Sequence, residues 1–141
     1  MYRLRERANR LIGEVGSLLY ENVPCEINLQ MREGKIEFPC DFEDIKDGFN
    51  DFQNGDFYAK DYYDKYCLFK INVKFPMVNE GEDLYLNICT NQGGHNMLKP
   101  QMLLYKDGVA LQGLDTNHRY VKLTEFSGTE QNFYLYALSG I

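Results

Sequence analysis

Hydrophobic residues recur at helical spacing near the N-terminus of the chain and then switch to the alternation that is typical of strands. The spacing predicts an amphipathic helix from Tyr2 to Glu21, which ends before Pro24. Its apolar stripe consists of Leu4, Ala8, Leu11, Ile12, Val15, Leu18 and Leu19. Gly13 and Gly16 each cost about 1 kcal/mol relative to Ala, so we expect this helix to depend on docking. We therefore treat residues 1–24 as a helical segment and 25–141 as the body of one domain.

The body alternates apolar and polar residues in short runs, which predicts strands. Ile27 to Met31 and Ile36 to Phe38 flank Glu33-Gly34 and predict a hairpin. Further strands are predicted at Leu68–Phe75, Leu84–Thr90, Met102–Tyr105, Val109–Leu111, Tyr120–Leu123 and Phe133–Leu138. Lys106-Asp107-Gly108 predicts a tight turn. This pattern favours a mainly β fold, a jelly-roll-like (galactose-binding-like) sandwich flanked by the N-terminal helix.

The segment from Asp41 to Lys65 has no sustained period, although it is rich in aromatic and acidic residues. We expect a long connection that its aromatic rings anchor to the sandwich. A sugar could instead stack on a platform formed by Tyr58, Tyr62, Tyr63 and Tyr66, because a flat ring complements the apolar face of a pyranose. Packing of these rings against the sandwich or at an interface is the favoured interpretation.

The length of the chain fits one domain, and its composition argues against nucleic acid and a membrane span. A chain of 141 residues with 44% hydrophobic residues is suited to a single core. The net charge of −6 argues against nucleic acid as a partner, because binding to phosphates needs clustered Lys and Arg. No run approaches the roughly 20 apolar residues that span a membrane. The four widely spaced cysteines, without a signal peptide, favour reduced thiols and a cytoplasmic location.

No pattern in the chain indicates catalysis. The two histidines, His95 and His118, lie far apart and neither belongs to a paired zinc-ligand motif, so we predict no metal site or other cofactor in this chain. No Ser or Cys nucleophile has an identifiable His partner. The many acidic residues lie in turn-like segments, and nothing selects one pair of them for glycoside hydrolysis.

One run is more specific than the others. Between Tyr105 and Leu123 a strand reaches Lys106-Asp107-Gly108 and returns, and Gly113-Leu114-Asp115 leads through Asn117-His118-Arg119 into a further strand. This run resembles the N-terminal domain of the cytosolic and vacuolar type of α-mannosidase, glycoside hydrolase family 38. The order of helix, hairpin, connector and strands also resembles that family, with Phe69-Lys70 to Phe75-Pro76 and Gly81 to Leu86 in matching places.

The resemblance implies a non-catalytic jelly-roll domain that packs on its own catalytic barrel and helps to shape substrate access or oligomer contacts. The parent enzyme would be a cytoplasmic, zinc-dependent retaining α-mannosidase that acts on mannose-containing oligosaccharides and can form homo-oligomers. Its zinc ligands and nucleophile would belong to the barrel, after Ile141. Asp115, Asn117, His118 and Arg119 would fix the corner or reach the interface or the sugar. The chain departs from the family in having no Trp.

Two other interpretations compete with an accessory domain. The chain could be a free-standing carbohydrate-binding module, which predicts weak sugar affinity that depends on Tyr62 or Tyr63. It could also be a structural interaction domain of unrelated origin.

Overall fold

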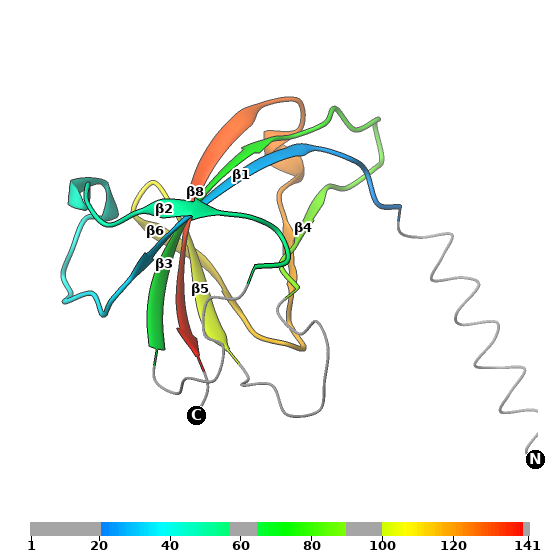
Figure 1. Ribbon diagram of the computed structural model, residues 1–141. Helices are drawn as coiled ribbons and strands as arrows, with labels where there is room; N and C mark the ends of the chain where they lie inside the picture. Colours follow the sequence, from blue (N-terminus) through cyan, green and yellow to red (C-terminus); the bar gives the residue numbers. More distant parts are fainter. Residues whose placement is uncertain (1–20, 57–64, 90–99, 140–141) are drawn as a thin grey trace, which may run out of the picture.

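Eight antiparallel strands in two sheets make up the described part of the chain, which in this computed structural model comprises residues 21–56, 65–89 and 100–139. The strands are β1 (Glu26–Glu33), β2 (Asn50–Phe52), β3 (Lys65–Lys74), β4 (Tyr85–Asn87), β5 (Gln101–Lys106), β6 (Val109–Leu114), β7 (Tyr120–Lys122) and β8 (Glu130–Ser139). Two short 3₁₀ turns, η1 (Phe42–Asp44) and η2 (Thr124–Phe126), complete the elements. The prediction of a mainly β fold is thereby confirmed (Figure 1).

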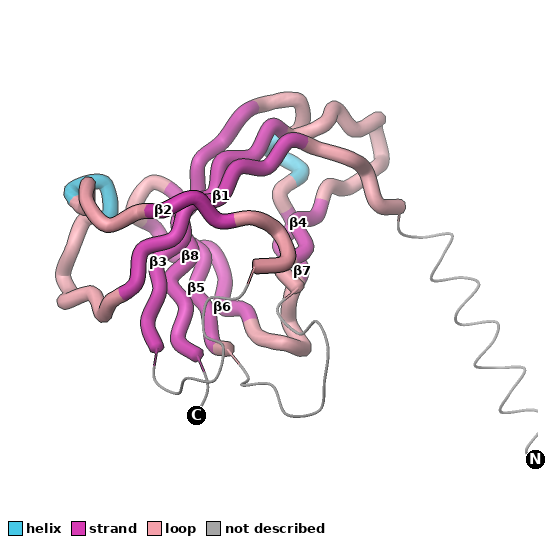
Figure 2. Tube along the Cα trace, in the orientation of Figure 1, coloured by secondary structure: helices cyan, strands magenta, loops and turns pink. Residues whose placement is uncertain are grey.

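The larger sheet has six strands in the order β2-β1-β3-β8-β5-β6, and its long central strands are β3 and β8 (Figure 2). Ten residue pairs join these two strands, from Lys65 opposite Ser139 to Lys74 opposite Glu130. Alternate residues of β3 and β8 point to one face and are buried, as the two-residue period requires. We call this side of the six-stranded sheet its core face and the opposite side its back face.

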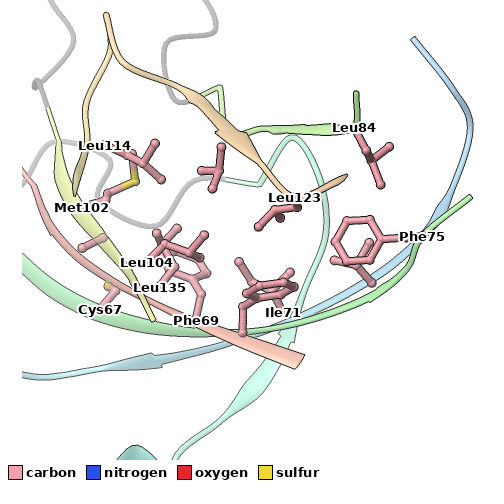
Figure 3. Packing of buried hydrophobic residues seen from close by; sticks show 14 residues of the cluster. Cys67, Phe69, Ile71, Phe75, Leu84, Met102, Leu104, Leu114, Leu123 and Leu135 are labelled. Atoms are coloured by element: carbon pink, nitrogen blue, oxygen red, sulfur yellow. The ribbon is translucent and has the colours of Figure 1, made fainter. Parts of the chain in front are cut away.

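The main hydrophobic core lies between the core face and a second layer made by the small sheet β4–β7. Leu84, Val121 and Leu123 from this layer share one buried cluster with residues of β3, β5 and β8 (Figure 3). The Leu123 N–H donates to the Leu84 carbonyl at 2.8 Å, which ties the two segments of the layer together. Each fully buried Leu or Phe of this cluster contributes about 1.5–3 kcal/mol of transfer free energy. The two sheets therefore form a β-sandwich around one core.

The hairpin of β5 and β6 forms as predicted. Asp107 and Gly108 have φ values of 51° and 78°, the left-handed backbone that a two-residue hairpin turn requires at both central positions. The pairing register shifts between Leu104 and Tyr105, and this places a bulge in the hairpin. Strand β6 also extends beyond its predicted end at Leu111 to Leu114.

The hairpin predicted at Glu33-Gly34 is wrong. Strand β1 pairs over its whole length with β3, and β2 flanks its other side. The residues after Gly34 instead cross the back face, where Ile36 and Phe42 are buried against Leu68 of β3. The ten-residue β3 offers eight cross-strand pairs to β1, whereas a partner strand from Ile36 to Phe38 would have offered only a few. The longer ladder determines the pairing.

The connector after Asp41 is anchored by aromatic rings as predicted, in the part that the structure describes. Phe42 packs edge-on against Tyr105, with their ring centroids 4.8 Å apart. Phe52 packs in the same way against Phe69 at 5.2 Å. Phe52 belongs to β2, a strand that the sequence pattern did not predict. The predicted helix from Tyr2 to Glu21 lies outside the described residues, apart from its last residue.

Candidate functional site

The corner between β6 and β7 brings together four of the predicted site residues, and Asp115 organises it. Its Oδ1 accepts hydrogen bonds from the backbone N–H groups of Asn117 at 2.8 Å and His118 at 2.7 Å. The Asp115 N–H donates to the His118 carbonyl at 3.0 Å, which closes the turn. A short acidic side chain that bonds the backbone ahead of it is a common device for fixing such a turn.

These hydrogen bonds stabilise the ionised form of the Asp115 carboxyl. The His118 and Asn117 backbone N–H groups, in that order, hold its pKa below its usual range. The His118 ring adds to this, because its Nδ1 lies 3.0 Å from Oδ1 of Asp115. The carboxylate is thus engaged within its own loop, and the geometry assigns it to the folding of the corner.

Arg119 leaves the corner in a different direction from the three residues before it. Its Nη1 donates to the Cys89 Sγ at 3.7 Å and its Nη2 donates to the Tyr120 hydroxyl at 3.4 Å. The guanidinium also lies 5.3 Å from the centroid of the Tyr120 ring. Its backbone carbonyl accepts from the Ile88 N–H at 2.8 Å, so this residue belongs to the edge of the β4–β7 layer.

Of the tyrosines predicted for a sugar platform, Tyr58, Tyr62 and Tyr63 lie outside the described residues. Tyr66 is described, and its ring stacks on Tyr136. Sequence reasoning missed a different pair of tyrosines, Tyr85 and Tyr120, whose side chains are 43% and 46% exposed. The signal was present in the alternation of Leu84, Leu86 and Ile88, which implies that Tyr85 faces solvent on its strand. It was overlooked because an exposed tyrosine on a strand is unremarkable until its neighbour is known.

A second group of aromatic rings on the back face is a packed cluster. Tyr136 stacks on Tyr66 with the ring centroids 5.8 Å apart, and its hydroxyl accepts from the Ile36 N–H at 3.0 Å. Burial, followed by the nearby carboxylate of Glu43, raises the pKa of Tyr134 to about 12. These rings hold the segment after Gly34 onto the sheet.

The described residues hold no group of three or more His, Cys, Asp or Glu side chains that could bind a metal ion. None of the four cysteines forms a disulfide bond. Burial raises the pKa of the Cys67 thiol to about 11, so this side chain behaves as a small core residue. Among the helices in the described part of the chain, none is long and apolar enough to cross a membrane.

In comparisons with known proteins, no protein-family model, no curated protein and no solved structure matches the chain.

Proposed function

We propose that this chain is a non-catalytic accessory domain of a glycoside hydrolase, of the kind that precedes the catalytic barrel in cytosolic and vacuolar-type α-mannosidases. The proposal includes the jelly-roll-like, galactose-binding-like arrangement of the sandwich and the N-terminal helix of residues 1–24. The domain packs on its own catalytic barrel and helps to shape access for mannose-containing oligosaccharides or contacts between protomers. The parent enzyme is cytoplasmic in this proposal.

The observation that carries the proposal is that the Asp115 carboxylate makes its hydrogen bonds within the Asp115–Arg119 corner itself. This is the stretch in which the sequence most resembles those enzymes, and its carboxylate bonds to the backbone N–H groups of Asn117 and His118. A carboxylate that is held ionised by its own loop suits a scaffold better than a general acid, which needs a raised pKa. The role of the corner is then to set the path of the chain from β6 into β7.

The proposal assigns the chemistry to the catalytic barrel. The zinc ion of such enzymes is expected in the barrel, as the family resemblance implies. No reaction step is assigned to any residue of this chain.

An activity assay on two samples tests the proposal. The isolated chain is expected to release no chromophore from a chromogenic α-mannoside. The native protein, captured from its source with antibodies raised against the chain, is expected to hydrolyse the same compound and to lose this activity with a zinc chelator. An inactive native protein, or an active isolated chain, would contradict the assignment. Capture with antibodies preadsorbed on the chain is the control.

A further inference from the structure

The solvent face of the small sheet carries four side chains in an alternating arrangement. Tyr85 lies opposite Lys122, and Asn87 lies opposite Tyr120. All four are exposed, while Leu86 and Val121 between them point inward. The two tyrosines therefore occupy one diagonal of the sheet, roughly 7–8 Å apart, and the amide and the ammonium group occupy the other. We call these four residues the tyrosine platform.

Polar contacts at its borders hold the backbone at Tyr120 and the Lys122 side chain of the tyrosine platform. The Gln112 Nε2 donates to the Tyr120 carbonyl at 2.8 Å, which links the platform to the edge of the six-stranded sheet. The Lys122 Nζ lies 3.5 Å from the Asp83 carboxylate. The Asp83 carboxylate also accepts from the Thr124 hydroxyl at 3.1 Å. For Lys122, part of the cost of ordering its side chain on binding is therefore already met in the free chain.

The size of the platform favours a small ligand over a protein. Two strands of three residues span about 10 Å by 10 Å of backbone, given a rise of about 3.3 Å per residue and a strand spacing of about 4.8 Å. A stable protein interface buries about 800 Å² on each partner, several times what this face offers. A ligand of one or two rings matches the face.

The chemistry of the platform matches a pyranose. Such a ring has an apolar face, which a tyrosine ring can cover, and hydroxyl groups at its rim, to which an amide or a cation can bond. Arg119 adds a planar set of donors beside Tyr120. Among the described residues, its side-chain contacts are a thiol and a phenol rather than a carboxylate, so its charge is available to an anionic group.

We infer that the tyrosine platform binds a short oligosaccharide, with one sugar ring on Tyr85, the next on Tyr120, and polar contacts from Asn87, Lys122 and Arg119. Arg119 lies in a chain of net charge −6, and its guanidinium favours a sugar that carries a carboxylate over its neutral counterpart, whereas the Lys122 ammonium is already paired with Asp83. This inference goes beyond the proposed function, since it needs no catalytic barrel.

Calorimetric titration of the full chain tests the inference, with a neutral oligomannoside and a hexuronate oligosaccharide of equal length as the two ligands. Both are expected to bind, the hexuronate more tightly. Tyr120→Ala and Tyr85→Ala are each expected to weaken binding about tenfold or more. Arg119→Gln is expected to remove the preference for the hexuronate and to leave the neutral ligand less affected.

Phe38→Ala is the matched control, because Phe38 is a somewhat more exposed aromatic residue, at 53%, whose ring contacts lie on the back face. It is expected to leave both affinities unchanged. NMR titration of the unmutated chain gives a measurement that does not depend on how the variants fold. Changes in backbone amide chemical shift are expected at Leu86, Asn87 and Val121. Failure of both sugars to bind, equal affinity for the two, or binding that survives the double change of Tyr85 and Tyr120 to Ala would overturn the inference. None of these outcomes bears on the activity of the native protein.

Discussion

Asp115 shows how one side chain can fix a turn and at the same time make stability depend on pH. Its folded-state pKa lies below the unfolded value because the His118 and Asn117 N–H groups stabilise the carboxylate. A group with a depressed folded pKa contributes stability above its unfolded pKa of about 3.9. That contribution is lost as the pH falls through the folded value.

Asp115→Asn is therefore expected to lower the free energy of unfolding at pH 7 and to have less effect as the pH falls below about 4. Urea denaturation of both proteins at a series of pH values measures this difference. Glu80→Gln, on the exposed turn between β3 and β4, serves as the control. A deficit in the Asn variant that stays constant down to the lowest pH would show that the charge plays no part.

Tyr136 holds the segment after Gly34 by ring packing on Phe38 and by one hydrogen bond to its hydroxyl. Tyr136→Phe leaves the Ile36 N–H without its acceptor in a residue that is 6% exposed. The expected cost is about 1–3 kcal/mol of unfolding free energy. Tyr120→Phe removes a hydroxyl from an exposed ring and is expected to change stability by less than about 0.5 kcal/mol. Equal losses in the two variants, measured by chemical denaturation, would refute the role of the buried hydroxyl.

At the scale of elements, the sequence predicted most strands and mispredicted one pairing. The tight turn at Asp107-Gly108 is a local signal, since two residues suffice to define it, and it forms as expected. The partner of β1 is a long-range choice. Strand β1 could have paired with the short stretch from Ile36 to Phe38 or with the ten-residue β3, more than thirty positions away. The local pattern of apolar residues does not show which of the two pairings forms more cross-strand hydrogen bonds. The short β2 was missed for a different reason: its three residues lie in the segment from Asp41 to Lys65, which has no sustained period.

The candidate site was also predicted only in part. The Asp115–Arg119 corner follows from a contiguous motif, whereas the tyrosine platform depends on two strands whose residues lie 35 positions apart, Tyr85 and Tyr120. Which exposed side chains become neighbours is decided by strand register. The alternation of apolar residues along the sequence does not specify the register between strands.

The β5–β6 turn offers a test of the backbone argument. Gly108 has a positive φ and open space around it, so Gly108→Ala is expected to cost about 1–2 kcal/mol from backbone strain alone. Gly113 lies in β6 without a positive φ, and an added Cβ would meet only a carbonyl oxygen at 4.0 Å. Gly113→Ala is expected to be neutral or to stabilise by up to about 1 kcal/mol. Thermal unfolding of both variants measures this difference. A Gly113→Ala variant less stable than Gly108→Ala would contradict the assigned turn.

For the whole molecule, stability depends on the contact between the two layers. Leu123 follows β7, is 1% exposed and belongs to the shared core. Leu123→Ala is expected to cost about 2–5 kcal/mol, because it leaves a cavity where the layers meet. Leu111→Ala, at a position that is 41% exposed, is expected to cost far less. A Leu123 variant as stable as the Leu111 variant in urea would mean that the small sheet does not pack on the large one.

The proposed function also belongs to the scale of the whole molecule, since it makes this sandwich one domain of a larger hydrolase. The most direct test is the size of the native polypeptide, detected by denaturing immunoblot of its source with antibodies against the chain. The account predicts a single polypeptide far above 16.5 kDa, which co-elutes with α-mannosidase activity on gel filtration of the undenatured extract. A band at the mass of the chain alone, in fractions without that activity, would contradict it.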